Sequence, residues 1–306
     1  MNRTAQVILN LIVGLVSFVF FIVYLFPLDA MIGHYLAEIE EQTKGKQNLK
    51  IEVASIDASL IFDTVFQEFR LYQNNEEVFY APKVSAGISL MPLISGSLNL
   101  GFLAEYRSGS VAGKVRLAED SVVDLDIKKV SFKEITYLTR YLEEKKMPSL
   151  SGTINGSVYF SWSSDLVSKE AEVSLKIANT KISPYFVKPL NLELPALELS
   201  TGQALVEIDG GLDKGQLNLE RFNIPGPDVV LDVSGNAKLN RRNQVVRVNL
   251  GGKFSLSEKL NKILPLDAML TGQKAPDGSY PVSVSGSLAS PRVKVGEMDL
   301  SEMLKF

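Results

Sequence analysis

The residue types that most often carry out chemistry are scarce in this chain. Its 306 residues include no cysteine and a single histidine, His34. The lack of cysteine excludes disulfides, thiolate nucleophiles and cysteine-ligated metals. A histidine-based metal cluster cannot be assembled, and a Ser-His-Asp triad could use only His34. We interpret His34 as a surface or interfacial histidine, because the sequence offers no partner for a ligand or proton-relay role.

Carboxylates are numerous, but their spacing favours solvated surfaces over a site. Asp124 and Asp126 are two residues apart, as on the polar face of a strand, although a divalent-cation site there is the alternative. No P-loop, dinucleotide-binding GxGxxG, GxSxG, HExxH or EF-hand loop occurs. Trp162 is the only tryptophan, and we interpret it as a packing residue. We therefore predict no catalytic residues, no cofactor and no metal, and a protein that is not an enzyme.

The bulk composition narrows the class of protein. Hydrophobic residues make up 45% and charged residues 22%, which excludes a disordered chain and a polytopic membrane protein. The formal net charge is -3, with no basic excess. Phosphate backbones are bound by clustered Lys and Arg, so nucleic acid is not an expected partner.

An uncharged apolar stretch near the N-terminus predicts a membrane anchor. Residues 7–26 carry no charge and, at about 1.5 Å per residue, cover the roughly 30 Å of a bilayer core. Arg3 precedes the stretch and several carboxylates follow it, which predicts a cytoplasmic N-terminus and a periplasmic remainder. A cleaved signal peptide is the alternative, but its apolar region would be shorter. A helix is expected to continue to about Gln42.

Beyond residue 50 the dominant period is two, which predicts strands with one apolar and one polar face. Turns are expected at residues 209–211, 213–215 and 240–243, where Gly, Asn and Asp cluster. Two segments with helical spacing interrupt the strands, at residues 131–146 and 255–264. In the first, Ser131 and Glu134 have the spacing of a capping box. Both are expected to cover the sheet or its edges.

The fold class predicted is mainly β: one N-terminal transmembrane helix, then an elongated, curved antiparallel sheet, groove-like or sandwich-like, with a few short covering helices. Three parts are expected. Residues 1–28 form a cytoplasmic tip and the anchor, residues 29–148 a juxtamembrane helix with a β-rich region, and residues 149–306 a second β-rich region.

Two family resemblances are carried by longer segments. The pattern of residues 50–72 and 79–100, after an apolar helix, resembles the start of AsmA-like proteins. The later chain resembles the type II secretion system protein N family (GspN), on segments that share its rhythm of small, apolar and polar residues: 151–160, 173–183, 192–211 and 215–239. The second resemblance implies a non-catalytic accessory subunit of the type II secretion system, anchored in the bacterial inner membrane, with other secretion-system subunits as partners. The first implies a β-groove that binds or conducts phospholipid or a lipopolysaccharide-type lipid.

The alternating apolar positions are the candidates to line such a groove. They are Val173, Leu175, Ile177, Leu217, Leu219, Val246, Val248 and Leu250. An apolar strand face must be covered by something, either a second protein layer or a ligand. The sequence alone leaves both alternatives open.

Overall fold

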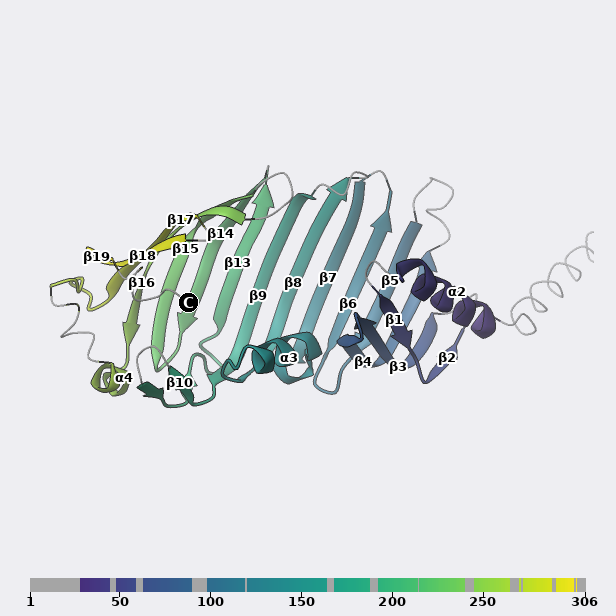
Figure 1. The fold of residues 1–306 in the computed structure, drawn as a ribbon, viewed down its shortest axis with the longest axis horizontal. Helices are drawn as coiled ribbons and strands as arrows, with labels where there is room; N and C mark the ends of the chain where they lie inside the picture. The colour runs from purple at the N-terminus through teal and green to yellow at the C-terminus, as the bar shows by residue number, and fades with distance from the viewer. Residues whose placement is uncertain are drawn as a thin grey trace, which may run out of the picture. The chain divides into compact units, whose positions relative to one another are not determined.

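The protein is mainly β, as predicted: a computed structural model has 66% of the chain in strands and 12% in helices (Figure 1). It describes residues 28–44, 48–58, 63–89, 98–118, 120–163, 168–187, 192–213, 215–239, 245–264, 270, 272–287, 290–299 and 301. Within these residues, no helix has both the length and the apolar character needed to span a bilayer. The anchor predicted at residues 7–26 lies outside the described residues.

The chain divides into two compact units. Residues 1–88 and 102–105 form the N-terminal unit, and residues 89–101 and 106–306 form the C-terminal unit. Strand β5 (Leu98–Glu105) contributes residues to each. The boundary expected near residue 148 lies inside the C-terminal unit, between β7 (Asp120–Ser131) and β8 (Leu150–Ser163), which are paired antiparallel.

The N-terminal unit is a small antiparallel sheet with one helix. Strand β3 pairs with β1 and β2 along one side and with β4 along the other. The elements are α2 (Leu28–Thr43), β1 (Leu49–Glu52), β2 (Ser55–Asp57), β3 (Thr64–Gln73) and β4 (Glu76–Ser89). Helix α2 ends one residue beyond the Gln42 expected, and the carboxylate of Glu40 accepts a hydrogen bond from the Ile51 N–H at 2.7 Å. This bond ties the helix to β1.

Aromatic and small side chains fill the core of this unit. The ring of Phe69 makes edge-to-face contacts with those of Phe66 and Phe79, each with centroids 6.0 Å apart. Phe66 is buried, and Ala81 is completely inaccessible. Such edge-to-face pairs contribute about 0.5–1.5 kcal/mol beyond the area they bury.

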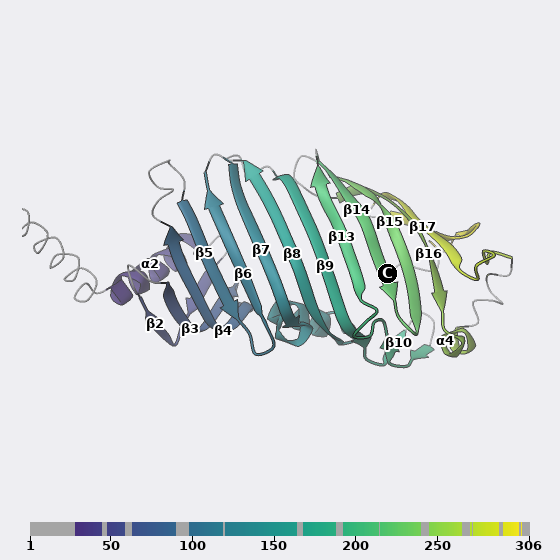
Figure 2. The same ribbon diagram turned by 180° about the vertical axis from the view of Figure 1, so that it is seen from behind.

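The C-terminal unit is built on a long antiparallel meander (Figures 1 and 2). Each strand pairs with the next from β6 to β9, and β9 then pairs with β13, from which the meander continues to β19. The other strands are β6 (Ser110–Leu117), β9 (Ser168–Ile182), β13 (Val206–Asp213), β14 (Gln216–Pro225), β15 (Val229–Leu239), β16 (Val245–Leu256), β17 (Tyr280–Ser287), β18 (Ser290–Val295) and β19 (Met298–Asp299). Between β9 and β13 the chain forms a hairpin of β10 (Tyr185–Val187) and β11 (Leu192–Leu194), then β12 (Leu197–Glu198), which pairs with the end of β9.

The turn expected at residues 209–211 is wrong. Gly210 and Gly211 lie inside β13, where the register with β14 shifts after Asp209. A Cβ on Gly210 would lie 2.5 Å from the Asn218 carbonyl oxygen. These glycines are therefore needed because neighbouring backbones come close together at a bulge, and not because the chain turns there. The turn at residues 213–215 is confirmed, with Gly215 at φ +77°.

Both helical segments exist, but their limits differ from those expected. Ser131 and Glu134 do form a capping box, yet it caps the short 3-10 helix η2 (Phe132–Glu134), and α3 (Thr136–Glu144) starts anew after Ile135. Ile135 leaves the helical conformation and packs against the core. The second helix, α4, covers only Glu258–Ile263, because β16 continues to Leu256 and Ser257 is the N-cap.

Candidate functional site

The register of the C-terminal unit gathers the apolar positions on one face of its sheet. Leu219 lies opposite Gly235, which lies opposite Leu250, and Leu250 lies opposite Val284. Because side chains alternate and the paired residues share a face, the same face continues through the strands from β6 to β9 and from β13 to β18. We call it the apolar face. It holds Val173, Leu175, Ile177, Leu217, Leu219, Val248 and Leu250, and Val246 lies in the same alternation at a register shift between β15 and β16.

Protein covers this face at one end of the strands. Phe132, Ile154, Ile177, Val206 and Ile224 form a buried cluster there. Ile135 and Leu138, from the η2–α3 segment, pack against it, and in Figure 1 α3 lies across the lower ends of the strands. Ile177 is 6% exposed, so it belongs to a sealed core. A smaller cluster of Leu270, Tyr280 and Val295 lies against the same face of β17 and β18.

Farther along the strands most of the apolar face is only half-buried, although Leu212 is 6% exposed. Val173, Leu217, Leu219 and Leu250 are neither buried nor fully exposed, and Leu175 borders the sealed cluster. Val248 is 9% exposed and Val246 is 41% exposed. Above α3 in Figures 1 and 2, the strands from β6 to β13 run as a single layer, with no second layer of described residues of the C-terminal unit across them. The shielding of these side chains comes largely from neighbours in the same sheet.

Several residues of the apolar face were missed in the sequence interpretation. They lie on strands whose alternation was not singled out: Val115, Val123, Leu125, Val158, Phe160, Leu212 and Ala237. The same period of two would have found most of them, since all but Leu212 are separated from another apolar residue by one residue. Trp162 stacks on Phe160 with centroids 5.6 Å apart, in agreement with a packing role.

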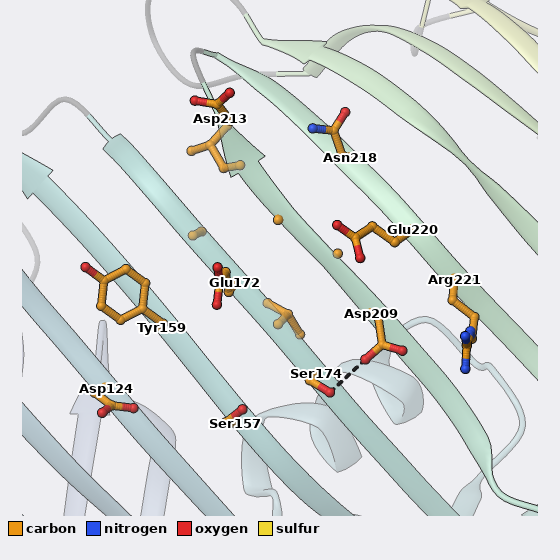
Figure 3. Close-up of a pocket in the computed structure, with 15 residues that line it drawn as sticks. Asp124, Ser157, Tyr159, Glu172, Ser174, Asp209, Asp213, Asn218, Glu220 and Arg221 are labelled. Carbon is orange, nitrogen blue, oxygen red and sulfur yellow. Dashed lines mark hydrogen bonds between the residues drawn. The ribbon is translucent and has the colours of Figure 1, made fainter.

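The opposite face of the sheet is polar, and part of it forms an acidic hollow (Figure 3). Its volume is about 680 Å³. The lining residues are Asp124, Ser157, Tyr159, Ala171, Glu172, Val173, Ser174, Asp209, Gly210, Gly211, Leu212, Asp213, Asn218, Glu220 and Arg221. Asp124 and Asp126 are exposed, as a solvated strand face requires. Across the described ranges, no three His, Asp or Glu side chains are placed to hold a metal.

The bonds at this hollow are those of an ordinary polar sheet surface. The Ser174 hydroxyl donates to Asp209 at 2.7 Å (Figure 3). Arg221 is paired with Glu207 at 2.8 Å, and this carboxylate raises the pKa of the guanidinium. The pairing fixes side-chain positions but brings no nucleophile next to a base.

Comparisons of this chain with protein-family models, with curated proteins and with solved structures found no match. The resemblances to AsmA-like proteins and to the type II secretion system protein N family therefore remain predictions. The function has to be argued from the surfaces of the C-terminal unit.

Proposed function

We propose that this protein is a non-catalytic bacterial envelope protein that holds the acyl chains of lipids against the apolar face. In this proposal residues 7–26 anchor it in the inner membrane, and the β body extends into the periplasm as an elongated, curved sheet open on one side. The observation that carries the proposal is the half-buried central part of the apolar face, which has no second layer among the described residues of the C-terminal unit.

The physical reason is the cost of leaving apolar area in water. Burial of apolar surface stabilises by about 25 cal/mol per Å², so a row of half-exposed Val and Leu side chains favours any apolar cover. An acyl chain supplies such a cover and gains about 0.8 kcal/mol for each methylene it buries. Because this attraction is not directional, the apolar face is expected to select for chains and to discriminate little between head groups.

The sealed end fits the same proposal. Helix α3 and the cluster around Ile154 and Ile177 close the apolar face at one end of the strands, where they form a second layer over the sheet. At this end the apolar side chains are covered by protein. Beyond it, the half-buried side chains are available to contact a ligand.

A role as an accessory subunit of the type II secretion system is a second proposal, and it has its own support. Four segments carry that resemblance, and they map onto adjoining strands of one sheet, from β8 and β9 to β13, β14 and β15. The test is a strain that lacks the gene, with plasmid complementation as control. Accumulation of a known exoprotein in the periplasm is the expected result, and normal release into the medium contradicts the secretion role.

Lipid analysis of the purified full chain tests the first proposal. We expect mass spectrometry to detect phospholipid or a lipopolysaccharide-type lipid in protein extracted with a mild detergent. Leu250→Glu places a charge on the half-buried apolar face and should lower the bound lipid severalfold while the protein stays folded. Gly251→Glu is the matched control, because the adjacent residue is exposed on the polar face and has open space around its Cβ position.

Two results would contradict the lipid proposal. One is a wild-type protein that carries no lipid above the level of a detergent blank. The other is unfolding of the Leu250→Glu variant together with an intact Gly251→Glu variant, because a position that cannot accept a charge at all is sealed by protein.

A further inference from the structure

A second hollow lies on the polar face of the C-terminal unit, over β14 to β18. Its volume is about 620 Å³. We call it the basic hollow, and its lining residues are Gln216, Asn236, Lys238, Arg247, Val248, Asn249, Ser285, Gly286 and Arg292. Three of these residues are cations, and none is a carboxylate, although the whole chain carries a net charge of -3. The positive charge here is therefore a local concentration.

The strand register arranges these side chains in two parallel rows. In one row Asn236 lies opposite Asn249, Asn249 opposite Ser285, and Ser285 opposite Arg292. In the other row Gln216 lies opposite Lys238, and Lys238 opposite Arg247. Neighbouring strands are about 4.8 Å apart, so each cation lies within one or two strands of an amide or hydroxyl group on the same face.

The charges of the two central cations are not compensated. Lys238 and Arg247 are directly opposite each other, and like charges in this relation destabilise a sheet. Neither forms an ion pair with another described residue. Arg292 approaches Asp299 at 3.7 Å, but Asp299 also accepts hydrogen bonds from the N–H and hydroxyl of Ser301. An anion in the hollow would offset a repulsion that the sheet otherwise carries.

Two cations elsewhere on the same face share a carboxylate partner. Arg221 lies 2.8 Å from Glu207, and Lys176 approaches the same carboxylate at 3.9 Å. Lys238 and Arg247, by contrast, lie opposite each other and not beside a carboxylate of this kind.

We propose that the basic hollow binds a phosphate group. Arginine presents a planar fork that matches phosphate oxygens, lysine adds a mobile point charge, and the amide and hydroxyl groups supply further donors. A single carboxylate has one negative charge and would neutralise only one of the three cations. A phosphate monoester carries about two negative charges, and a diphosphate carries more. The group can belong to a soluble phosphorylated compound or to a lipid head group. Since the hollow and the apolar face are on opposite sides of the sheet, this site is independent of the acyl-chain proposal.

Thermal unfolding of the full chain in an uncharged detergent tests the site. A ligand that binds only the folded state raises Tm as its concentration rises, and added salt weakens the effect. One arm titrates inorganic pyrophosphate. The other compares dihexanoyl phosphatidylglycerol with dihexanoylglycerol, which has the same acyl chains but no phosphate. A Tm rise common to both lipids reports the chains, and an excess with phosphatidylglycerol reports the phosphate site.

Arg247→Gln separates the site from general charge effects. We expect the variant without ligand to be at least as stable as the wild type, because a like-charge contact is removed, and its pyrophosphate affinity to fall about tenfold. Arg221→Gln is the matched control: it removes the same charge from the same face and should leave the affinity within about twofold.

The pyrophosphate titration and the lipid comparison distinguish the two sources of phosphate. A response to pyrophosphate that Arg247→Gln abolishes supports a soluble phosphorylated ligand. A response only to phosphatidylglycerol, again lost in Arg247→Gln, supports a lipid head group. No response in either arm, or equal losses in Arg247→Gln and Arg221→Gln, overturns the proposal.

Discussion

At the scale of single residues, glycine decides how closely neighbouring strands approach on the apolar face. Gly235 has φ +147°, and a Cβ there would lie 2.2 Å from the Asn249 carbonyl oxygen. Gly251, on the adjacent strand and the opposite face, has nothing within 4 Å of a built Cβ. The two glycines look alike in the sequence, yet only the first is required by its surroundings.

The substitution Gly235→Ala is therefore expected to destabilise the protein by about 2 kcal/mol, because it combines backbone strain with a backbone clash. Gly251→Ala should change the free energy of unfolding by about 0.5 kcal/mol or less. Chemical denaturation of both variants measures the difference. Equal effects would show that close approach at Gly235 is not needed.

Also at the scale of single residues, Asp277 makes the stability of the folded protein depend on pH. Its carboxylate accepts hydrogen bonds from the Ser279 hydroxyl and N–H and from Lys253, and these bonds hold its pKa well below its usual range. A depressed folded-state pKa contributes stability that is present above the ordinary pKa of about 3.9 and is lost as pH falls toward the folded-state value.

We expect the Tm of the wild type to fall between about pH 4 and pH 2, and the fall to be smaller in Asp277→Asn, which has no proton to take up. Asp213→Asn is the control, since Asp213 is an exposed carboxylate opposite Glu170 and Gln216. Parallel Tm profiles for the wild type and Asp277→Asn would contradict the assignment.

At the scale of elements, the η2–α3 segment covers the apolar face only where its own apolar side chains reach. Leu138 packs on the cluster of Phe132, Ile154 and Ile177, while the exposed side of the helix carries Glu143. The amphipathic spacing of this segment and its capping box were predictable, because both depend on residues three or four positions apart. The break at Ile135 was not, because it depends on the sheet beneath.

Leu138→Ala is expected to lower the free energy of unfolding by about 1–2 kcal/mol, less than for a fully buried leucine because the side chain is half-buried. Glu143→Ala on the exposed side should change it by about 0.5 kcal/mol or less. Urea denaturation with both variants compares the two sides of the helix. A Leu138→Ala protein as stable as the wild type would mean that α3 does not hold the cover in place.

At the scale of the molecule, the apolar face is the feature that brings distant segments together. Residues of β9, β14 and β16 are up to about 80 positions apart in the chain, yet cross-strand pairing puts them on one surface. That surface passes from sealed core at Ile177 to half-buried positions at Leu219 and Leu250. The loss of stability caused by a substitution on this surface should therefore depend on how far the replaced side chain is buried.

Val248→Asp is expected to destabilise the protein by about 3 kcal/mol or more, because Val248 is 9% exposed and a charge there has no partner. Asn249→Asp, the next residue on the polar face, should be tolerated. Circular dichroism and thermal unfolding distinguish the two variants. A folded, stable Val248→Asp protein would show that the open part of the apolar face includes Val248.

The sequence by itself determined the strand periodicity, the β-rich class, the helix of residues 28–43 and the apolar alternation within each strand that carries the eight predicted positions, because each depends on neighbours two to four residues apart. It did not determine which of these positions are sealed. That depends on where α3 and the cluster around Ile154 lie, which is a property of cross-strand register and packing. The bulge at Gly210 and the opposed charges of Lys238 and Arg247 likewise exist only once strands are paired, since pairing brings together residues that the chain keeps apart.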